Sequence, residues 1–211
     1  MTKVWLIRHG ESEANAGFSS SVPAEIPLTD TGWKQAQMVS MAFEQAPSLI
    51  VMSKYARAFQ TAQPTINRFP NVPTRTWDVH EFTYLSSEKL GNTSREERKP
   101  LVKNFWANCD PDYLHGTGAE SFSNFIERIE VMKEKIMALD DGFVAIFSHG
   151  YVIKALFWAN LLNSFEATSE YMKNFHRFHT SFNLSNGVII ECQSDSKNLL
   201  FSGIITDHLN N

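Results

Sequence analysis

Residues 4–11 read Val-Trp-Leu-Ile-Arg-His-Gly-Glu, and residues 143–150 read Phe-Val-Ala-Ile-Phe-Ser-His-Gly. Each stretch is a short apolar run that stops at a His-Gly pair. Apolar runs of this length are typical of buried strands in a parallel sheet. In open α/β sheets, ligand-binding and catalytic residues lie just beyond the carboxyl ends of the strands. The two stretches therefore predict that Arg8, His9 and His149 lie at one edge of a sheet.

Strand and helix patterns alternate along the chain. We predict strands over 4–7, 49–52, 74–77, 143–147, 182–184, 187–192 and 199–205, and helices from about 30 to 45, 56 to 67, 122 to 139 and 151 to 162. Thr29, Asp30 or Thr31 can cap the first helix. Asn186-Gly187 is predicted to turn a hairpin. This alternation predicts an α/β fold, a three-layer α/β/α sandwich with a mostly parallel central sheet.

The predicted domain organisation is a single domain over residues 1–211, since this length suits one domain with a sizeable core. Periodicity is poorer over 82–118, where several Gly and Pro residues interrupt it, although 94–108 is compatible with a helix. We predict that 82–118 is an insertion over the active site, similar to a lid.

Composition restricts the partners of this chain. Lys plus Arg number 19 and Asp plus Glu number 23, for a net charge of -4, which argues against broad nucleic-acid binding. A small anionic substrate is still possible, because a few arginines can make one pocket positive. The apolar runs are too short to cross a membrane. No signal peptide is evident, so the expected location is the cytoplasm.

The sequence predicts neither a metal nor a cofactor. Its two cysteines, Cys109 and Cys192, are far apart, and no Cys/His ligand spacing occurs. Two distant cysteines are typical of reduced thiols in a cytosolic protein.

Side chains that can act in catalysis or in anion binding follow four of the predicted strands. Besides Arg8, His9 and His149, Arg57 lies one helical turn after the second strand, and Glu81 follows the third. Arginines match phosphate oxygens, and a neutral imidazole can attack phosphorus. A carboxylic acid can protonate the leaving oxygen and then activate water. This set of residue types favours phosphoryl transfer.

Several motifs occur in a fixed order between Val4 and Ala155, about three quarters of the chain. They are Arg8-His9-Gly10-Glu11 with Asn15, Leu28-Thr29-x-x-Gly32 with Gln35-Ala36, Ser53-x-x-x-Arg57-Ala58-x-Gln60-Thr61-Ala62, Gly118-Ala119-Glu120-Ser121, and Ser148-His149-Gly150. With these motifs the chain resembles the histidine phosphatase superfamily, in its phosphoglycerate-mutase-like branch.

The resemblance implies a role for each pocket residue. His9 is the expected nucleophile, which becomes phosphohistidine, and Glu81 is the expected proton donor. Arg8, Arg57 and His149 complete the phosphate pocket. Asn15 is expected to hydrogen-bond a phosphate oxygen, and Ser21, in a serine run, is a further candidate for substrate binding. No metal is implied.

Alternatives remain open at this point. Asp78 and Glu120 compete with Glu81 as the proton donor. His176, Arg177 and His179 form a basic cluster that is either a solvated segment or part of the pocket rim. The predicted activity is a metal-independent phosphatase acting on a small phosphorylated substrate. The alternatives are a phosphomutase and a catalytically inactive phosphate-binding module; the long basic insertion typical of mutases in this branch is not evident.

Overall fold

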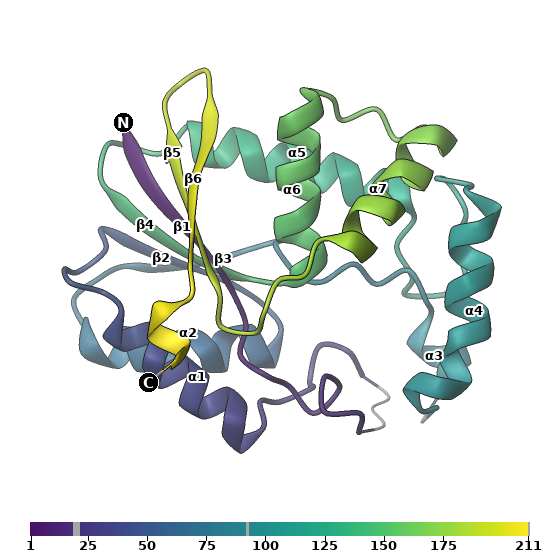
Figure 1. The fold of residues 1–211 in the computed structure, drawn as a ribbon, viewed down its shortest axis with the longest axis horizontal. Helices are drawn as coiled ribbons and strands as arrows, with labels where there is room; N and C mark the ends of the chain where they lie inside the picture. Colours follow the sequence, from purple (N-terminus) through teal and green to yellow (C-terminus); the bar gives the residue numbers. More distant parts are fainter. Residues whose placement is uncertain (19–21, 92, 211) are drawn as a thin grey trace.

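The computed structural model describes residues 1–18, 22–91 and 93–210. A six-stranded sheet with the order β3-β2-β4-β1-β5-β6 forms its centre (Figure 1). The first four of these strands are parallel, whereas β5 and β6 run antiparallel to their neighbours. The strands are β1 (Thr2–Arg8), β2 (Leu49–Ser53), β3 (Thr74–Trp77), β4 (Phe143–Ser148), β5 (Ile189–Ser194) and β6 (Leu199–Ile205). The predicted mostly parallel sheet is confirmed.

Helices cover both faces of the sheet, which confirms the three-layer sandwich (Figure 1). The α-helices of the described residues are α1 (Asp30–Met41), α2 (Ala56–Arg68), α3 (Ser87–Leu90), α4 (Arg95–Asn108), α5 (Phe122–Met137), α6 (Gly150–Leu162) and α7 (Ser169–Ser181). A 3-10 helix, Asp207–Asn210, follows β6.

Alternation along the strands separates two cores. Trp5 and Ile7 of β1 pack with α1 and α2, whereas Val4 and Leu6 pack with α5, α6 and α7. This follows from the strand geometry, in which successive side chains point to opposite faces. All residues of β4 are buried, as expected for a central parallel strand covered on both sides.

The first helix is capped by one of the three residues proposed for it. The Thr29 hydroxyl accepts a hydrogen bond from the Gly32 N–H, at 3.1 Å. The helix ends at Met41 rather than near Gln45, so its predicted end was about one turn too late.

The predicted hairpin at Asn186-Gly187 is wrong, and 182–184 forms no strand. The Asn186 side-chain amide donates to the carbonyl oxygens of His9 (3.0 Å) and Gly10 (3.2 Å). The Gly187 N–H donates to the carbonyl oxygen of Arg8, at 3.1 Å. The dipeptide still forms a turn, in which the Val188 N–H donates to the Ser185 carbonyl oxygen at 3.3 Å, but this turn packs on the end of β1 and has no strand before it.

The observed hairpin joins β5 to β6. Its turn is closed by Asp195, whose carboxylate accepts from the N–H groups of Lys197 and Asn198, both at 2.7 Å. The segment between α6 and Asn186, for which no helix was predicted, contains α7, with Tyr171, Met172 and Phe175 buried. These three apolar residues at helical spacing were the signal for it.

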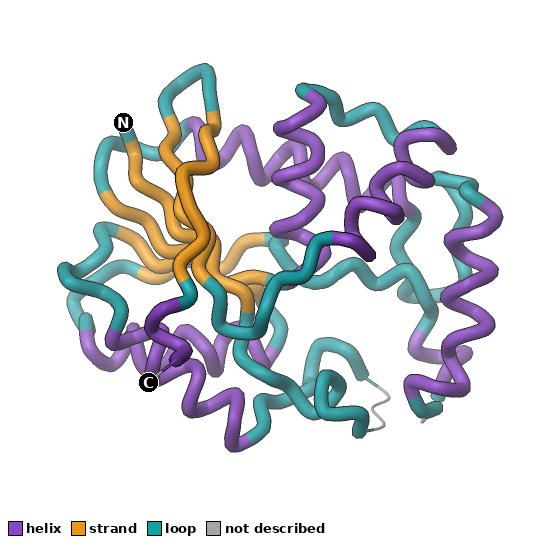
Figure 2. The backbone as a smooth tube through the Cα atoms, viewed as in Figure 1, coloured by secondary structure: helices purple, strands orange, loops and turns teal. Residues whose placement is uncertain are grey.

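Residues 82–118 contribute α3 and α4, which lie at the end of the molecule remote from β5 and β6 (Figure 2). Phe82, Phe105 and Trp106 anchor this segment in the core that contains α5 and α7. Its closure over a bound substrate stays a prediction. No helix of the described residues has the length and apolar character needed to span a membrane.

Candidate active site

The parallel strands bring the predicted residues to one edge of the sheet. His9 follows β1 and His149 follows β4, whereas Glu81 lies in the segment after β3. Their potential ligand atoms all lie within 4.8 Å of one another, and the centroids of the two imidazole rings are 5.1 Å apart. Arg57, in the first turn of α2, contacts the same cluster through His9. These residues and Arg8 are called the phosphate pocket below.

His9 is held with one ring nitrogen available for attack. Its Nδ1 lies 2.7 Å from the carbonyl oxygen of Gly10, an acceptor, so Nδ1 carries the proton. Arg57 Nε donates to His9 Nε2 at 3.2 Å, which requires a lone pair on Nε2. Burial, followed by the charges of Arg57 and Arg8, lowers the pKa of His9 well below its usual value. His9 is therefore a neutral imidazole with a nucleophilic Nε2.

Both arginines are fixed by backbone carbonyls. Arg57 Nη1 donates to the Pro23 carbonyl oxygen at 2.7 Å, and its guanidinium lies 5.0 Å from the ring centre of Tyr55. Arg8 Nη1 donates to the Leu184 carbonyl oxygen. Arg8 Nε is buried with no hydrogen-bond partner in the described parts of the chain. The buried Arg57 and the partly buried Arg8, beside neutral rings, form a site for an anion.

Glu81 is the carboxyl group that the fold brings to this cluster. Its Oε1 accepts from the N–H of Phe82 (3.2 Å) and from that of Tyr151 (3.1 Å), in the first turn of α6. Burial raises the pKa of Glu81, against the opposing effect of Arg57 and Arg8. A raised pKa favours a protonated side chain that can act as an acid.

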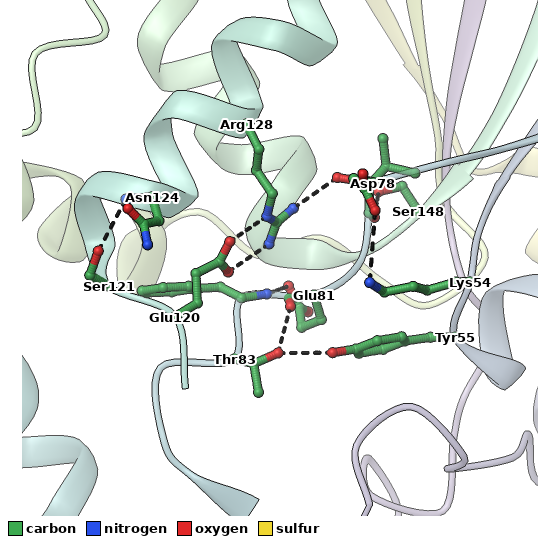
Figure 3. A network of polar contacts seen from close by, with 12 residues as sticks. Lys54, Tyr55, Asp78, Glu81, Thr83, Glu120, Ser121, Asn124, Arg128 and Ser148 are labelled. Carbon is green, nitrogen blue, oxygen red and sulfur yellow. Dashed lines mark hydrogen bonds and ion pairs between the residues drawn. The ribbon is translucent and has the colours of Figure 1, made fainter. Parts of the chain in front are cut away.

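The two alternative donors have other partners (Figure 3). Asp78 is exposed and lies 3.7 Å from Lys54 Nζ. Glu120 binds Arg128 through both carboxylate oxygens, at 2.5 and 2.8 Å. Neither belongs to the cluster of titratable groups around His9.

A polar network holds the segment that carries Glu81 (Figure 3). Arg128 Nη1 donates to the Asp78 carbonyl oxygen at 3.2 Å. The Thr83 hydroxyl donates to the Glu81 carbonyl oxygen at 3.1 Å and lies 2.9 Å from the Tyr55 hydroxyl. This segment has no regular secondary structure, so side chains replace the hydrogen bonds of a strand.

Ser53, the last residue of β2, contacts His149, a role that the sequence did not indicate. Ser53 Oγ accepts from the Tyr55 N–H at 3.2 Å and lies 2.9 Å from His149 Nε2. The Ser53 hydroxyl can therefore donate a hydrogen bond to His149 Nε2, and the ring proton of His149 is then on Nδ1. His149 Nδ1 is buried without a partner among the described residues. Burial and Arg57 lower the pKa of His149 well below its usual value, so the ring is neutral.

Packing explains why the other motif residues are needed. A Cβ on Gly32 would lie 2.0 Å from the carbonyl oxygen of Glu11, so only glycine permits α1 to start against the His9 loop. Thr61 accepts from the Gly10 N–H at 3.0 Å, and Gln35 accepts from the Glu11 N–H at 2.7 Å. These helix side chains fix the loop that follows β1.

Asn15 lies on the wall of the cleft described below. Its Oδ1 accepts from Ser12 Oγ (3.0 Å) and from Asn186 Nδ2 (3.1 Å), which leaves Nδ2 as its donor. Ser21 lies outside the described residues.

A cleft of about 890 Å³ extends from the phosphate pocket. Besides Arg57 and Glu81, its walls include residues of the N-terminal loop, of the 82–118 segment, of α6 and of α7. His176 and His179 line it, whereas Arg177 is exposed elsewhere. Two members of the basic cluster thus belong to the pocket rim.

A metal ion is disfavoured by charge. His9, Glu81 and His149 are the described residues that could supply three ligands. However, Arg8 and Arg57 are close enough to shift the pKa values of His9 and Glu81. Two adjacent cations oppose a divalent ion and favour an anion.

Comparisons with known proteins identify the family of this chain. The family model "Histidine phosphatase superfamily (branch 1)" matches residues 4–194. An adenosylcobalamin/alpha-ribazole phosphatase of Salmonella typhimurium is 28% identical over 166 residues, covering 73% of this chain and 77% of its own.

Solved structures share the fold. A phosphoserine phosphatase of Entamoeba histolytica, in complex with 3-phosphoglyceric acid, superposes with a TM-score of 0.72 at 24% identity, covering 99% of this chain and all of the other. The alpha-ribazole phosphatase of Shigella flexneri gives 0.69 at 23% identity, with 97% and 96% covered. Because the family model matches most of the sequence, this chain belongs to the histidine phosphatase superfamily, branch 1.

Proposed function

We propose that the protein is a metal-independent phosphatase that hydrolyses a phosphomonoester through a phosphohistidine intermediate on His9. The observation that carries the proposal is the state of His9, a neutral ring with Nε2 free of a proton and next to a buried arginine. Relatives named as phosphatases support the reaction class.

The first step transfers the phosphoryl group to the protein. His9 Nε2 attacks phosphorus, so an N–P bond forms while the bond to the ester oxygen breaks. Glu81, whose pKa is raised by burial, gives a proton to the departing alkoxide. Arg8, Arg57 and His149 Nδ1 stabilise the charge on the phosphoryl oxygens.

The second step releases inorganic phosphate. The Glu81 carboxylate takes a proton from a water molecule, whose oxygen attacks phosphorus. The N–P bond breaks, and its electron pair returns to His9 Nε2. Glu81 is protonated again, so the cycle consumes only ester and water.

Phosphate release tests the proposal against the two alternatives. We expect release from p-nitrophenyl phosphate and glycerol 3-phosphate with a chelator present, and trapping of labelled phosphate on His9. Conversion of 3-phosphoglycerate to its 2-isomer without phosphate release would indicate a mutase. Binding of phosphate with no turnover would indicate the inactive module. Activity that vanishes with chelator and returns with a divalent ion would contradict metal independence.

A further inference from the structure

The cleft beyond the phosphate pocket is far larger than the transferred phosphoryl group needs. Its volume of about 890 Å³ lies high in the range of pockets that bury ligands of drug size, roughly 300–1,000 Å³. The leaving group of the substrate is what must occupy this space, because Glu81 lies on the cleft wall.

One wall of the cleft is made of uncharged rings. The rings of Trp106 and Tyr151 are parallel within 3°, with centroids 6.1 Å apart. His176 stacks on Trp106 at 4.5 Å, and His179 stacks on Tyr151 at 3.8 Å. Burial lowers the pKa of both histidines, that of His179 to about 3, so they are neutral near pH 7. These four residues are called the ring wall.

The ring wall begins beside the reacting atoms. The Tyr151 N–H donates to Glu81 Oε1 at 3.1 Å, so the alcohol that receives the proton of Glu81 leaves next to Tyr151. Trp106 is 4% exposed, so a flat group meets mainly the other rings of this wall, by burial and aromatic contact.

Helix α4 adds positive charge farther along the same cleft. Lys99, Lys103 and Trp106 all line it, at positions i, i+4 and i+7 of one helix face. At 1.5 Å per residue, Lys103 lies roughly 5 Å and Lys99 roughly 10 Å from Trp106 along the axis. Lys99 contacts Glu96 at 2.6 Å, whereas Lys103 pairs with no acidic residue in the described ranges. Glu81 is the one carboxylate among the described residues that line the cleft.

From this order of groups we propose that the substrate is a phosphomonoester whose alcohol part contains a flat ring system and, beyond it, a second anionic group. The phosphate occupies the phosphate pocket, the ring lies against the ring wall, and the second anion faces Lys103 and Lys99. This inference rests on the proposed phosphatase activity and names its substrate class.

Three substrates with the same leaving oxygen test the inference: ribose 5-phosphate, adenosine 5'-monophosphate and its N6-succinyl derivative. The first lacks the ring, and only the third carries anions beyond it. We expect kcat/KM to rise at least about tenfold from the first to the second through ring burial. A further rise of about fivefold is expected for the third at low salt, the size typical of partly exposed charge pairs.

Variants on α4 isolate the second anion. In Lys103→Glu and Lys99→Glu the preference for the succinyl derivative over adenosine 5'-monophosphate should fall to about one or below. High salt should reduce the same preference in the unaltered protein. Lys173→Glu, an exposed charge reversal on α7 outside the cleft, is the matched control and should change neither ratio.

Each failure has a separate meaning. Equal kcat/KM values for ribose 5-phosphate and adenosine 5'-monophosphate would overturn the ring site. A succinyl preference that is absent, or that is insensitive to salt and to both lysine variants, would overturn the anion site. If p-nitrophenyl phosphate is not hydrolysed either, the proposed phosphatase function itself fails.

Discussion

The phosphate pocket and the ring wall are built in different ways. His9, Glu81 and His149 follow strands or the loops after them, and backbone groups or neighbouring side chains fix each of them. The ring wall combines one residue of α4, one of α6 and two of α7, which are held by stacking on one another. Sheet geometry thus positions the proposed catalytic groups, whereas helix packing shapes the cleft proposed for the leaving group. Changes in the first region should therefore affect every substrate, and changes in the second should affect the choice between substrates.

Replacement of His9, the proposed nucleophile, gives the largest expected effect. His9→Ala should lower kcat by at least about 10⁴-fold for all substrates, because no N–P bond can form. A rapid quench with labelled substrate should then trap no phosphoenzyme. His176→Ala, in the ring wall, is the comparison and should still form it. A phosphoenzyme of full yield in His9→Ala would place the nucleophile elsewhere.

The effect of replacing Glu81, the proposed acid, should depend on the leaving group. Glu81→Gln should lower kcat for glycerol 3-phosphate by roughly 10²–10⁴-fold, the range for a lost general acid. The loss should be small for p-nitrophenyl phosphate, since nitrophenolate leaves without a proton. In the unaltered protein, kcat for the alkyl ester should fall as the pH rises through the raised pKa of Glu81, because the acid form is lost. Asp78→Asn is the control, because the Asp78 carboxylate is exposed and lies outside the cluster around His9. An equal deficit on both esters would assign the acid to another residue.

Variants of Ser53 test whether its hydroxyl fixes the tautomer of His149. Ser53→Ala removes the hydrogen bond to His149 Nε2. It should lower kcat about tenfold, which corresponds to the free energy lost when one buried polar group has no hydrogen-bond partner. Ser53→Thr keeps the hydroxyl and should restore most activity. Nitrogen NMR of His149 should show the proton on Nδ1 in the unaltered protein and a mixture of tautomers in Ser53→Ala. A proton on Nε2 in the unaltered protein would refute this role.

The pair of Arg128 and Glu120 should contribute to stability and to the position of Glu81. Arg128→Ala leaves a poorly exposed carboxylate without its partner, which should lower the free energy of unfolding by roughly 2–4 kcal/mol. Denaturant titration measures this. Lys54→Ala, which removes an exposed pair at the same segment, should cost less than about 1 kcal/mol. Similar losses in both variants would contradict the importance of burial.

The smallest expected effect is the pH dependence of stability that His179 of the ring wall causes. Burial, together with Lys154, His176 and Arg8, lowers the pKa of His179 to about 3. Below about pH 6.5 this histidine binds a proton in the unfolded chain but not in the folded one. The free energy of unfolding therefore decreases as the pH falls below about 6.5. Tm should drop by several degrees from pH 7 to 5. His179→Phe keeps a ring against Tyr151 and should flatten this dependence; an unchanged slope would contradict the assignment.

Local sequence was sufficient for the parts of the fold that depend on local patterns. Apolar runs located the parallel strands, and β3 begins and ends at the predicted residues. At Asn186-Gly187 the predicted turn forms, but the predicted hairpin was wrong, because residues 182–184 form no strand. The turn instead bonds to the end of β1, more than 170 residues away in the chain.

The sequence by itself determined the class of fold, the family and the residue types at the strand ends, since strand periodicity and motif spacing are properties of neighbouring residues. Only the tertiary structure decided which carboxyl group joins the two histidines, that Ser53 contacts His149, and that α4, α6 and α7 share one ring wall. These relations depend on distances between segments far apart in the chain. Such distances are set by how the helices pack on the sheet, and no local pattern encodes them.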